Sequence, residues 1–315
     1  MPCQLAKFLI SLRNAVFAGC LVATLFSSLA AHAKVDVLAS IKPLALIAEA
    51  VVQDKAQVNT LLPVQASPHD YALRASDMQR IHDADLVLWI GPELESFLRR
   101  PLANLAPEQR MMVYQLPGLF WPEKGAGEEE QNEGRGESVH RHMHDHTHTR
   151  DPHLWLDPRN AVVIARALAV RLGEIDTSSA ARYHANAEAF AAQQESLDQR
   201  LQASLKPFAY TGFAVYHEGY SHFAGRYGLH QVAYVTLSPE RRPGARHLYQ
   251  LRQQLANNAS CLFIESYYDT RIGADLAREL DLRLATLDPI GNESVTSYTQ
   301  LLEQLAKGFR DCLEH

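Results

Sequence analysis

The chain has 315 residues, of which 47% are hydrophobic and 21% are charged, the composition of a globular protein long enough for two domains. Its formal net charge of -6 argues against a general nucleic-acid-binding protein, since such proteins are usually basic, and we expect no nucleic-acid partner. The sequence also contains no Walker-type phosphate loop and no GxGxxG motif, which excludes the common nucleotide-binding signatures.

The N-terminal segment has the organisation of an export signal. Lys7 and Arg13 precede an apolar run at 15–30, and an A-x-A cleavage site ends at Ala33. The run of about 16 residues is shorter than the roughly 20 needed to span a membrane. We therefore predict that 1–33 is a signal peptide, cleaved after Ala33 during export to the periplasm, in preference to a retained membrane anchor.

The four cysteines divide between the signal and the mature chain. Cys20 weakly resembles a lipoprotein cleavage site, but the apolar run continues well past it. After cleavage Cys261 and Cys312 remain, and two cysteines in an exported chain suggest one disulfide. The alternative is a pair of buried free thiols.

From residue 34 to about 121, strand patterns alternate with helical patterns. The run DLVLWIG at 85–91 is continuously apolar, as expected of a parallel strand buried on both faces. Such alternation predicts a parallel sheet with helices on both sides. We expect strands at 35–40, 57–63, 85–91 and 111–116, and helices at 42–52, 76–84 and 93–104.

The composition changes at 122–150, which is rich in Gly, Glu and His and almost lacks large apolar residues. Such a segment buries too little surface to offset its ordering entropy, so we interpret it as a mobile insertion in the first lobe. Its end reads HRHMHDHTHTR. A flexible chain must lose entropy to wrap a metal, which predicts an accessory low-affinity metal site; the alternative is a solvated polar tail. The histidines of this run are His140, His142, His144, His146 and His148.

A helical pattern at 158–174 is followed by a longer one at 179–205, which Pro207 ends. A helix of this length is about 40 Å long, enough to form a strut between two lobes. The alternation of strands and helices then restarts. We expect strands at 213–216, 231–237, 261–266 and 282–288, and helices at 219–227, 244–256, 270–280 and 297–312.

These patterns predict an α/β protein with two lobes and mainly parallel sheets. We assign 34–176 to the first lobe, 177–206 to the bridging helix and 207–315 to the second lobe. Loops at the carboxyl ends of parallel strands line the cleft between such lobes, so a binding site is expected there.

Three histidines occupy positions that can reach this cleft. His69 lies between a strand and a helix, His153 lies just before a helix, and His217 ends a strand. Three neutral imidazoles are a suitable donor set for zinc, which favours nitrogen ligands. Any one of them alone is more often a surface residue or a hydrogen-bonded one.

A fourth ligand is also expected. Asp288 in TLDPIG ends the last predicted strand and would offset part of the metal's charge. Its alternative role is to cap the Asp-Pro turn. Glu218, next to His217, and a water molecule are the competing fourth ligands.

The stretch HEGYSH at 217–222 superficially suggests a zinc protease. It has one residue more than the HExxH motif, so on a helix its two histidines lie about 140° apart and do not share one metal. We therefore reject the protease interpretation.

The segments SPHDYALRASDMQRIHDADLVLWIGPELESFL, DPHLWLDP, HEGYSHFAGRYGL and TLDPIG, in this order, resemble the periplasmic zinc-binding component of bacterial high-affinity zinc ABC transporters. The resemblance covers essentially all of the mature chain. It implies two Rossmann-like lobes joined by one long rigid helix, with the metal between the lobes. The implied site residues are the ligands His69, His153 and His217, the disulfide Cys261–Cys312, and a histidine-rich insertion at 140–148. In the manganese-binding relatives the position of Asp288 also ligates.

The resemblance implies a receptor that carries Zn²⁺ to a membrane permease driven by an ATPase. We expect a monomer and no enzymatic activity. A manganese or iron receptor on the same scaffold is the first alternative, although manganese-binding relatives carry glutamate where His217 stands. A metal-dependent hydrolase, for which Glu218 is the only candidate base, and a metal-binding adhesin are further alternatives.

Overall fold

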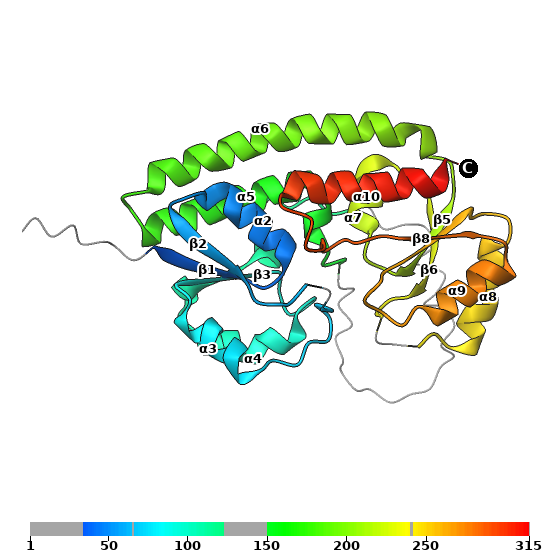
Figure 1. Ribbon diagram of the computed structural model, residues 1–315, viewed down its shortest axis with the longest axis horizontal. Coiled ribbons are helices and arrows are strands. Elements are labelled where there is room, and N and C mark those ends of the chain that lie inside the picture. Colours follow the sequence, from blue (N-terminus) through cyan, green and yellow to red (C-terminus); the bar gives the residue numbers. More distant parts are fainter. Residues whose placement is uncertain (1–33, 65, 123–149, 240–241, 315) are drawn as a thin grey trace, which may run out of the picture. The chain divides into compact units, whose positions relative to one another are not determined.

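The structure is a computed structural model that describes residues 34–64, 66–122, 150–239 and 242–314 (Figure 1). The expected signal segment 1–33 and the five histidines of 140–148 lie outside the described residues. In the part of the chain that is described, no helix has the length and apolar character needed to cross a membrane.

The first sheet contains four parallel strands in the order β2-β1-β3-β4. The apolar run expected to be a buried strand forms β3, and all four of its residues are buried. The parallel sheet predicted for this half is confirmed. Its strands are β1 (Val35–Ala39), β2 (Ala56–Thr60), β3 (Leu86–Trp89) and β4 (Arg110–Met112).

The second sheet repeats this arrangement, with four parallel strands in the order β6-β5-β7-β8. In both sheets the first strand of the half is central, the second lies on one side of it, and the third and fourth lie on the other. Because all neighbours are parallel, the carboxyl ends of the strands gather at one edge of each sheet. The strands are β5 (Phe213–His217), β6 (Gln231–Thr236), β7 (Cys261–Ile264) and β8 (Arg283–Thr286).

Helices flank the two sheets (Figure 1). The α-helices are α2 (Lys42–Val52), α3 (Ala75–Asp83), α4 (Arg99–Ala103), α5 (Pro158–Ile175), α6 (Ala180–Leu205), α7 (Ser221–Tyr227), α8 (Ala245–Leu255), α9 (Arg271–Glu279) and α10 (Tyr298–Leu313). Short 3-10 helices are η1 (Ser96–Leu98), η2 (Pro107–Gln109), η3 (Val113–Gln115), η4 (Leu154–Leu156) and η5 (Lys206–Phe208).

The expected elements of the first lobe differ from the structure mainly at their ends; the strand expected at 57–63, for example, ends at Thr60. The helix expected at 93–104 is broken into η1 and α4, because Pro101 lacks an N–H and is tolerated only in the first turn of a helix. The strand expected at 111–116 ends at Met112. Beyond it the Tyr114 amide still donates to the Ile90 carbonyl at 2.8 Å, but the chain then turns through η3.

The long helix α6 has 26 residues and is therefore about 40 Å long. It packs against α2 and α5 of the first lobe and against α7 and α10 of the second (Figure 1). One buried apolar cluster continues from Val37 in the first sheet through Phe190 of α6 to Phe263 in the second sheet. The two lobes thus share a core, which favours a rigid connection over a wide hinge.

A disulfide joins Cys261, the first residue of β7, to Cys312 in α10. Both residues are buried, and the bond attaches the last helix to the second sheet as the sequence predicted. By the loop-entropy model, closing a loop of 51 residues contributes about 4 kcal/mol of stability.

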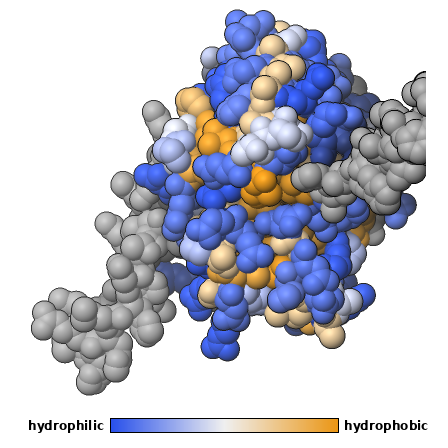
Figure 2. Space-filling model, turned by 90° about the vertical axis from the view of Figure 1, so that its left-hand side faces the viewer, coloured by the Kyte–Doolittle hydropathy of each residue, from blue (hydrophilic) through white to orange (hydrophobic). Residues whose placement is uncertain are grey.

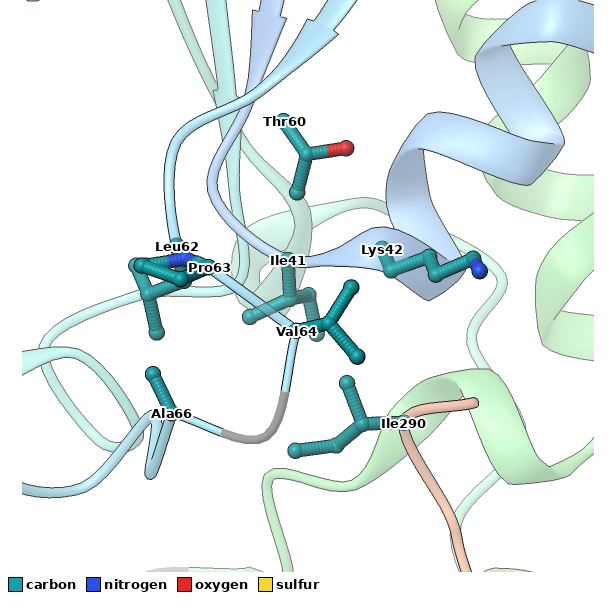
Figure 3. A pocket seen from close by; sticks show the side chains of 8 residues that line it. All are labelled: Ile41, Lys42, Thr60, Leu62, Pro63, Val64, Ala66 and Ile290. Atoms are coloured by element: carbon teal, nitrogen blue, oxygen red, sulfur yellow. The ribbon is translucent and has the colours of Figure 1, made fainter. Parts of the chain in front are cut away.

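The lobes also meet around a small apolar cavity of about 40 Å³ (Figure 3). Ile41 and Leu62 line it from the first lobe, and Ile290 closes it from the second. Beside it the Lys42 ammonium donates to the Asn292 carbonyl at 2.5 Å, which adds a polar contact between the lobes. The cavity is about the size of a water molecule's share of liquid and is a packing feature of the lobe contact.

Figure 2, which looks at the end formed by the first lobe, shows predominantly hydrophilic side chains with smaller hydrophobic areas between them.

Glu95 is a fully buried carboxyl in the loop after β3. It receives hydrogen bonds from the Ser40 hydroxyl and, at 3.0 Å, from the Gly91 amide. These bonds tie the loop after β3 to the end of β1. Burial raises the pKa of Glu95 from 4.5 to about 7, although the hydrogen bonds from Ser40 and the backbone oppose the shift.

We predict that Glu95 makes stability fall as the pH rises from about 4.5 to 7. Over this interval the unfolded chain has lost a proton that the folded chain retains, so the free energy of unfolding decreases, by about 3 kcal/mol for a pKa near 7. Glu95→Gln is neutral at every pH and should lose this slope. Denaturant unfolding at pH 5 and pH 7.5 measures it, with the exposed Glu279→Gln as control. A Glu95→Gln variant with the wild-type slope would contradict the prediction.

Candidate metal centre

His217 is the last residue of β5, the strand paired with both β6 and β7. A residue at the carboxyl end of this strand faces the edge where the loops of the second lobe gather. The side chain is 1% exposed. Its position thus follows directly from the parallel topology.

His153 is placed by the segment DPHLWLDP. His153 precedes η4, and Asp157 then caps α5 by accepting the Arg159 amide, with Pro158 as the first helical residue. The second lobe holds the same segment, because the indole N–H of Trp155 donates to the Pro289 carbonyl at 2.7 Å. His153 is 2% exposed, so it is fixed at the contact between the lobes.

His69 lies in the loop between β2 and α3. Its amide donates to the Ser67 hydroxyl at 3.2 Å, and the residue is half-buried. The ring nitrogen Nε2 is buried and makes no hydrogen bond within the described part of the chain. An unpaired buried nitrogen is costly, and a metal is one partner that would satisfy it.

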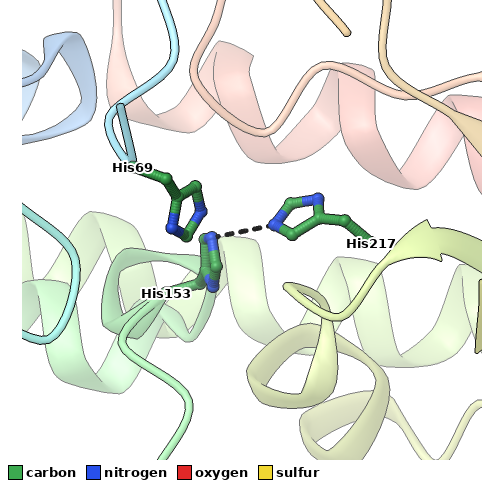
Figure 4. Close-up of side chains that lie close together, drawn as sticks. All are labelled: His69, His153 and His217. Carbon is green, nitrogen blue, oxygen red and sulfur yellow. Dashed lines mark hydrogen bonds between the residues drawn. The ribbon is translucent and has the colours of Figure 1, made fainter. Parts of the chain in front are cut away.

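The three histidines converge on one point (Figure 4). Their ring centroids are 5.1 to 5.3 Å apart, and one nitrogen of each lies within 4.8 Å of the others. His153 Nε2 and His217 Nε2 are 3.3 Å apart. Two nitrogens at 2.0–2.1 Å from a tetrahedral ion are separated by about 3.3–3.4 Å. The pair of histidines already has the spacing of ligands on one zinc-sized ion.

The hydrogen bonds of the Nδ1 atoms determine which ring nitrogen of His153 and of His217 carries the proton. His153 Nδ1 donates to Asp151 Oδ1 at 2.6 Å, and His217 Nδ1 donates to Glu265 Oε1 at 2.8 Å. A carboxylate only accepts, so in a neutral imidazole the proton sits on Nδ1 and Nε2 carries a lone pair. When both rings are neutral, the two Nε2 lone pairs therefore face the same space, and a cation between them would satisfy both.

The electrostatics favour unprotonated histidines at two of the positions. Burial lowers the pKa of His69 well below its usual value, and the nearby His153 and His217 lower it further. Burial also lowers the pKa of His153, against the opposing effect of Asp151. At His217 burial is outweighed by Glu265, whose charge and hydrogen bond raise the pKa. Neutral imidazole is the form that binds metal.

Asp288 and Glu218 are placed differently from the histidines. Asp288 Oδ1 accepts the amides of Ile290 and Gly291 at 3.2 and 2.8 Å, so it caps the turn after β8. Glu218 Oε2 accepts the Gln231 amide group at 2.5 Å. Within the described residues, the group whose ligand atoms lie within 4.8 Å of one another contains only the three histidines.

The structure adds three residues that the sequence analysis did not select. Asp151 and Glu265 orient the two buried histidines, and Gly219 lies against their rings. Asp151 stands two residues before His153, and Glu265 follows the end of β7 directly. Both positions could therefore have been recognised in the sequence as carboxylates near the expected site. Without the strand order, however, nothing identified Glu265 as a neighbour of His217.

Comparison with known proteins identifies the family. Residues 37–312 match the family described as "Zinc-uptake complex component A periplasmic". The chain belongs to this family. Among curated relatives, the "High-affinity zinc uptake system protein ZnuA" of Yersinia pestis is 36% identical over 90% of this chain and 92% of its own length. The protein of the same description from Haemophilus ducreyi is 35% identical over 89% of this chain and 94% of its own.

Solved structures support the fold. A crystal structure of ZnuA superposes with a TM-score of 0.72 at 24% identity, covering 89% of this chain and 99% of that one. The laminin-binding protein of Streptococcus agalactiae, described as having adhesin and metal-transporting activity, gives a TM-score of 0.73 at 23% identity over 89% and 99% of the two chains. The expected architecture of two α/β lobes with a long helix is thereby confirmed.

Gly219 is predicted to be required for metal binding in this zinc-uptake family member. A Cβ atom there would lie 2.6 Å from His217 Nε2 and 3.0 Å from His153 Cε1, so the rings must shift. We expect Gly219→Ala to weaken divalent-metal binding by roughly tenfold or more, at least about 1.4 kcal/mol. Gly244→Ala, where an added Cβ meets nothing within 4 Å, is the matched control. Calorimetric titration of both variants checks this, and equal affinities would show that the space beside the rings is not needed.

Proposed function

We propose that this chain is a periplasmic receptor that captures Zn²⁺ and delivers it to the permease and ATPase of a zinc-uptake complex. The observation that carries the proposal is the 3.3 Å separation of His153 Nε2 and His217 Nε2, with both Nδ1 protons committed to carboxylates. His69 supplies the third nitrogen. The family match and the zinc-uptake relatives support the same cargo.

Zinc is favoured over manganese by the donor atoms. Three imidazole nitrogens form a borderline donor set that suits zinc, whereas manganese sites are typically rich in carboxylate and other oxygen donors. A manganese or iron receptor on this scaffold is therefore the second candidate, and competition between Zn²⁺ and Mn²⁺ for the purified protein separates the two.

A fourth ligand completes the site in our proposal, either water or Asp288. For Asp288 to bind, its carboxylate must reach the metal while keeping or exchanging the two amide bonds that hold it in the turn. Water needs no such rearrangement. Glu218 is the least suitable candidate, because its carboxylate is engaged by Gln231.

We further propose that the protein is a carrier and not an enzyme. A hydrolase needs a base beside the metal, and the side chain offered for that role, Glu218, is bonded to Gln231. The carrier acts as a monomer after export and cleavage behind Ala33, with lobes at 34–176 and 207–315 joined by 177–206. The core that the lobes share limits their motion, so metal exchange involves local movement around the site.

The site assignment predicts the result of replacing one ligand. His153→Ala removes one of the two preset nitrogens and should lower zinc affinity by at least roughly a hundredfold, about 2.7 kcal/mol. His184→Ala, an exposed histidine of α6, is the control and should bind zinc normally. Competition calorimetry measures both affinities. High-affinity zinc binding that persists in His153→Ala would refute the site.

The histidines at 140, 142, 144, 146 and 148 are proposed as an accessory, low-affinity zinc collector, because they stand a few residues before the ligand His153. Deleting 140–148 should remove the additional zinc equivalents and leave one tight site. Metal analysis of the purified protein before and after dialysis measures the number of weak and of tight zinc sites. Loss of the tight site in the deletion variant would show that the assignment of the two classes is wrong.

A further inference from the structure

The start of α7 contacts both carboxylates that orient the buried histidines. Three consecutive side chains take part. The Tyr220 hydroxyl donates to Glu265 Oε1 at 2.8 Å, and the Ser221 hydroxyl donates to Asp151 Oδ2 at 2.5 Å. His222 Nε2 donates to the Asp151 carbonyl at 3.0 Å. One short segment of the second lobe thus holds a residue from each lobe.

Both carboxylate oxygens of Asp151 accept hydrogen bonds. Its Oδ1 accepts both the amide and the Nδ1–H of His153, at 3.0 and 2.6 Å, and its Oδ2 accepts Ser221. These three hydrogen bonds fix the orientation of the buried Asp151 carboxylate, and the carboxylate in turn fixes the orientation of the His153 ring.

Glu265 holds His217 in a comparable way. Its Oε1 accepts both His217 Nδ1–H and the Tyr220 hydroxyl, while its Oε2 is buried with no hydrogen bond among the described residues. The side chain is fully buried. A buried carboxylate with one oxygen unpaired is costly to stability, which points to a functional reason for it.

We infer that Asp151 and Glu265, held by Tyr220 and Ser221, are positioning residues for the metal ligands His153 and His217. This inference rests on the proposed function, because it assigns roles around the same site. The carboxylates keep each proton on Nδ1 and aim both Nε2 lone pairs at the ion. When ionised they also carry a formal charge of −2, which balances a divalent cation without contacting it.

His69 differs from the other two proposed ligands in its hydrogen bonding. His153 and His217 each have a carboxylate partner, whereas His69 Nε2 is buried and unpaired. Outer partners of metal-bound histidines typically contribute 10–100-fold to metal affinity, because they set the tautomer and raise the basicity of the ligand. Asp151 and Glu265 therefore orient the rings of His153 and His217 only. His69 supplies a third nitrogen without such a partner.

The experiment compares alanine with the isosteric amide at both positions, using Zn²⁺ titration in competition with a chelator. Asp151→Ala and Glu265→Ala should each weaken zinc binding by roughly 10–100-fold. Asp151→Asn and Glu265→Gln keep an oxygen that accepts Nδ1–H, so they should recover several-fold of that loss. Glu188→Gln, an exposed carboxylate paired with Arg166, is the control and should bind zinc normally.

A second readout distinguishes positioning from general stability. Nitrogen-15 NMR of the metal-free protein reports which ring nitrogen carries the proton. We expect the Nδ1–H tautomer at His153 and His217 in the wild type and in the amide variants, and a mixture at the neighbouring histidine in the alanine variants. Because this readout needs no metal, correct tautomers in a wild type that binds zinc weakly would refute the proposed function and leave the positioning roles standing.

Variants with milder changes protect the test against misfolding. Tyr220→Phe and Ser221→Ala each remove one donor to a carboxylate and should weaken zinc binding several-fold while the protein unfolds at a near-normal temperature. The inference is overturned if folded alanine variants keep wild-type zinc affinity, if the amide variants recover nothing, or if both Tyr220→Phe and Ser221→Ala bind zinc as tightly as the wild type.

Discussion

The facing Nε2 atoms of His153 and His217 form the contact on which the proposed metal site depends. They lie 3.3 Å apart, and the hydrogen bonds of Nδ1 to carboxylates place a lone pair on each. Two neutral rings at this distance repel unless a proton or a metal ion lies between the two nitrogens, so the surrounding structure must fix both rings. Much of the architecture around the site serves this requirement.

The fold meets the requirement by holding the His217 ring within the second lobe and the His153 ring from both lobes. His217 ends the central strand β5, and Glu265 beside it follows the adjacent strand β7. His153 belongs to the first lobe, yet its partner Asp151 receives Ser221 and His222 from the second. The shared apolar core and α6 then keep the two lobes in register, so that the ring spacing is not lost to domain motion.

Several residues of the stretch HEGYSH at 217–222 have different roles in the proposed site. His217 points at the proposed metal position, and Gly219 leaves room beside its ring. The hydroxyls of Tyr220 and Ser221 hold the orienting carboxylates, and His222 donates to the Asp151 carbonyl. The two histidines of this stretch have different roles. His217 is one of the three converging histidines, whereas His222 bonds to the Asp151 carbonyl and is not part of that group. This agrees with the rejection of a protease motif, in which both histidines would bind one metal.

Much of the fold was predictable from local patterns. Apolar runs and helical periodicity indicated eight strands, and the structure has strands in all eight regions, with errors at the ends of elements. Where a proline or a turn interrupts the pattern, as at Pro101 and after Met112, periodicity overestimated the length of the element. The disulfide also agrees with the sequence prediction, since only two cysteines lie outside the predicted signal segment.

The sequence by itself determined which residues could bind metal, because histidines at strand ends and before helices are recognisable from local patterns alone. Only the tertiary structure decided which nitrogen of His153 and of His217 faces the proposed metal position, and which carboxylates orient the two rings. His217 and Glu265 are 48 residues apart, and Asp151 and Ser221 are 70 apart. Contacts at such separations depend on strand order and on how the lobes pack, and local patterns carry no information about either.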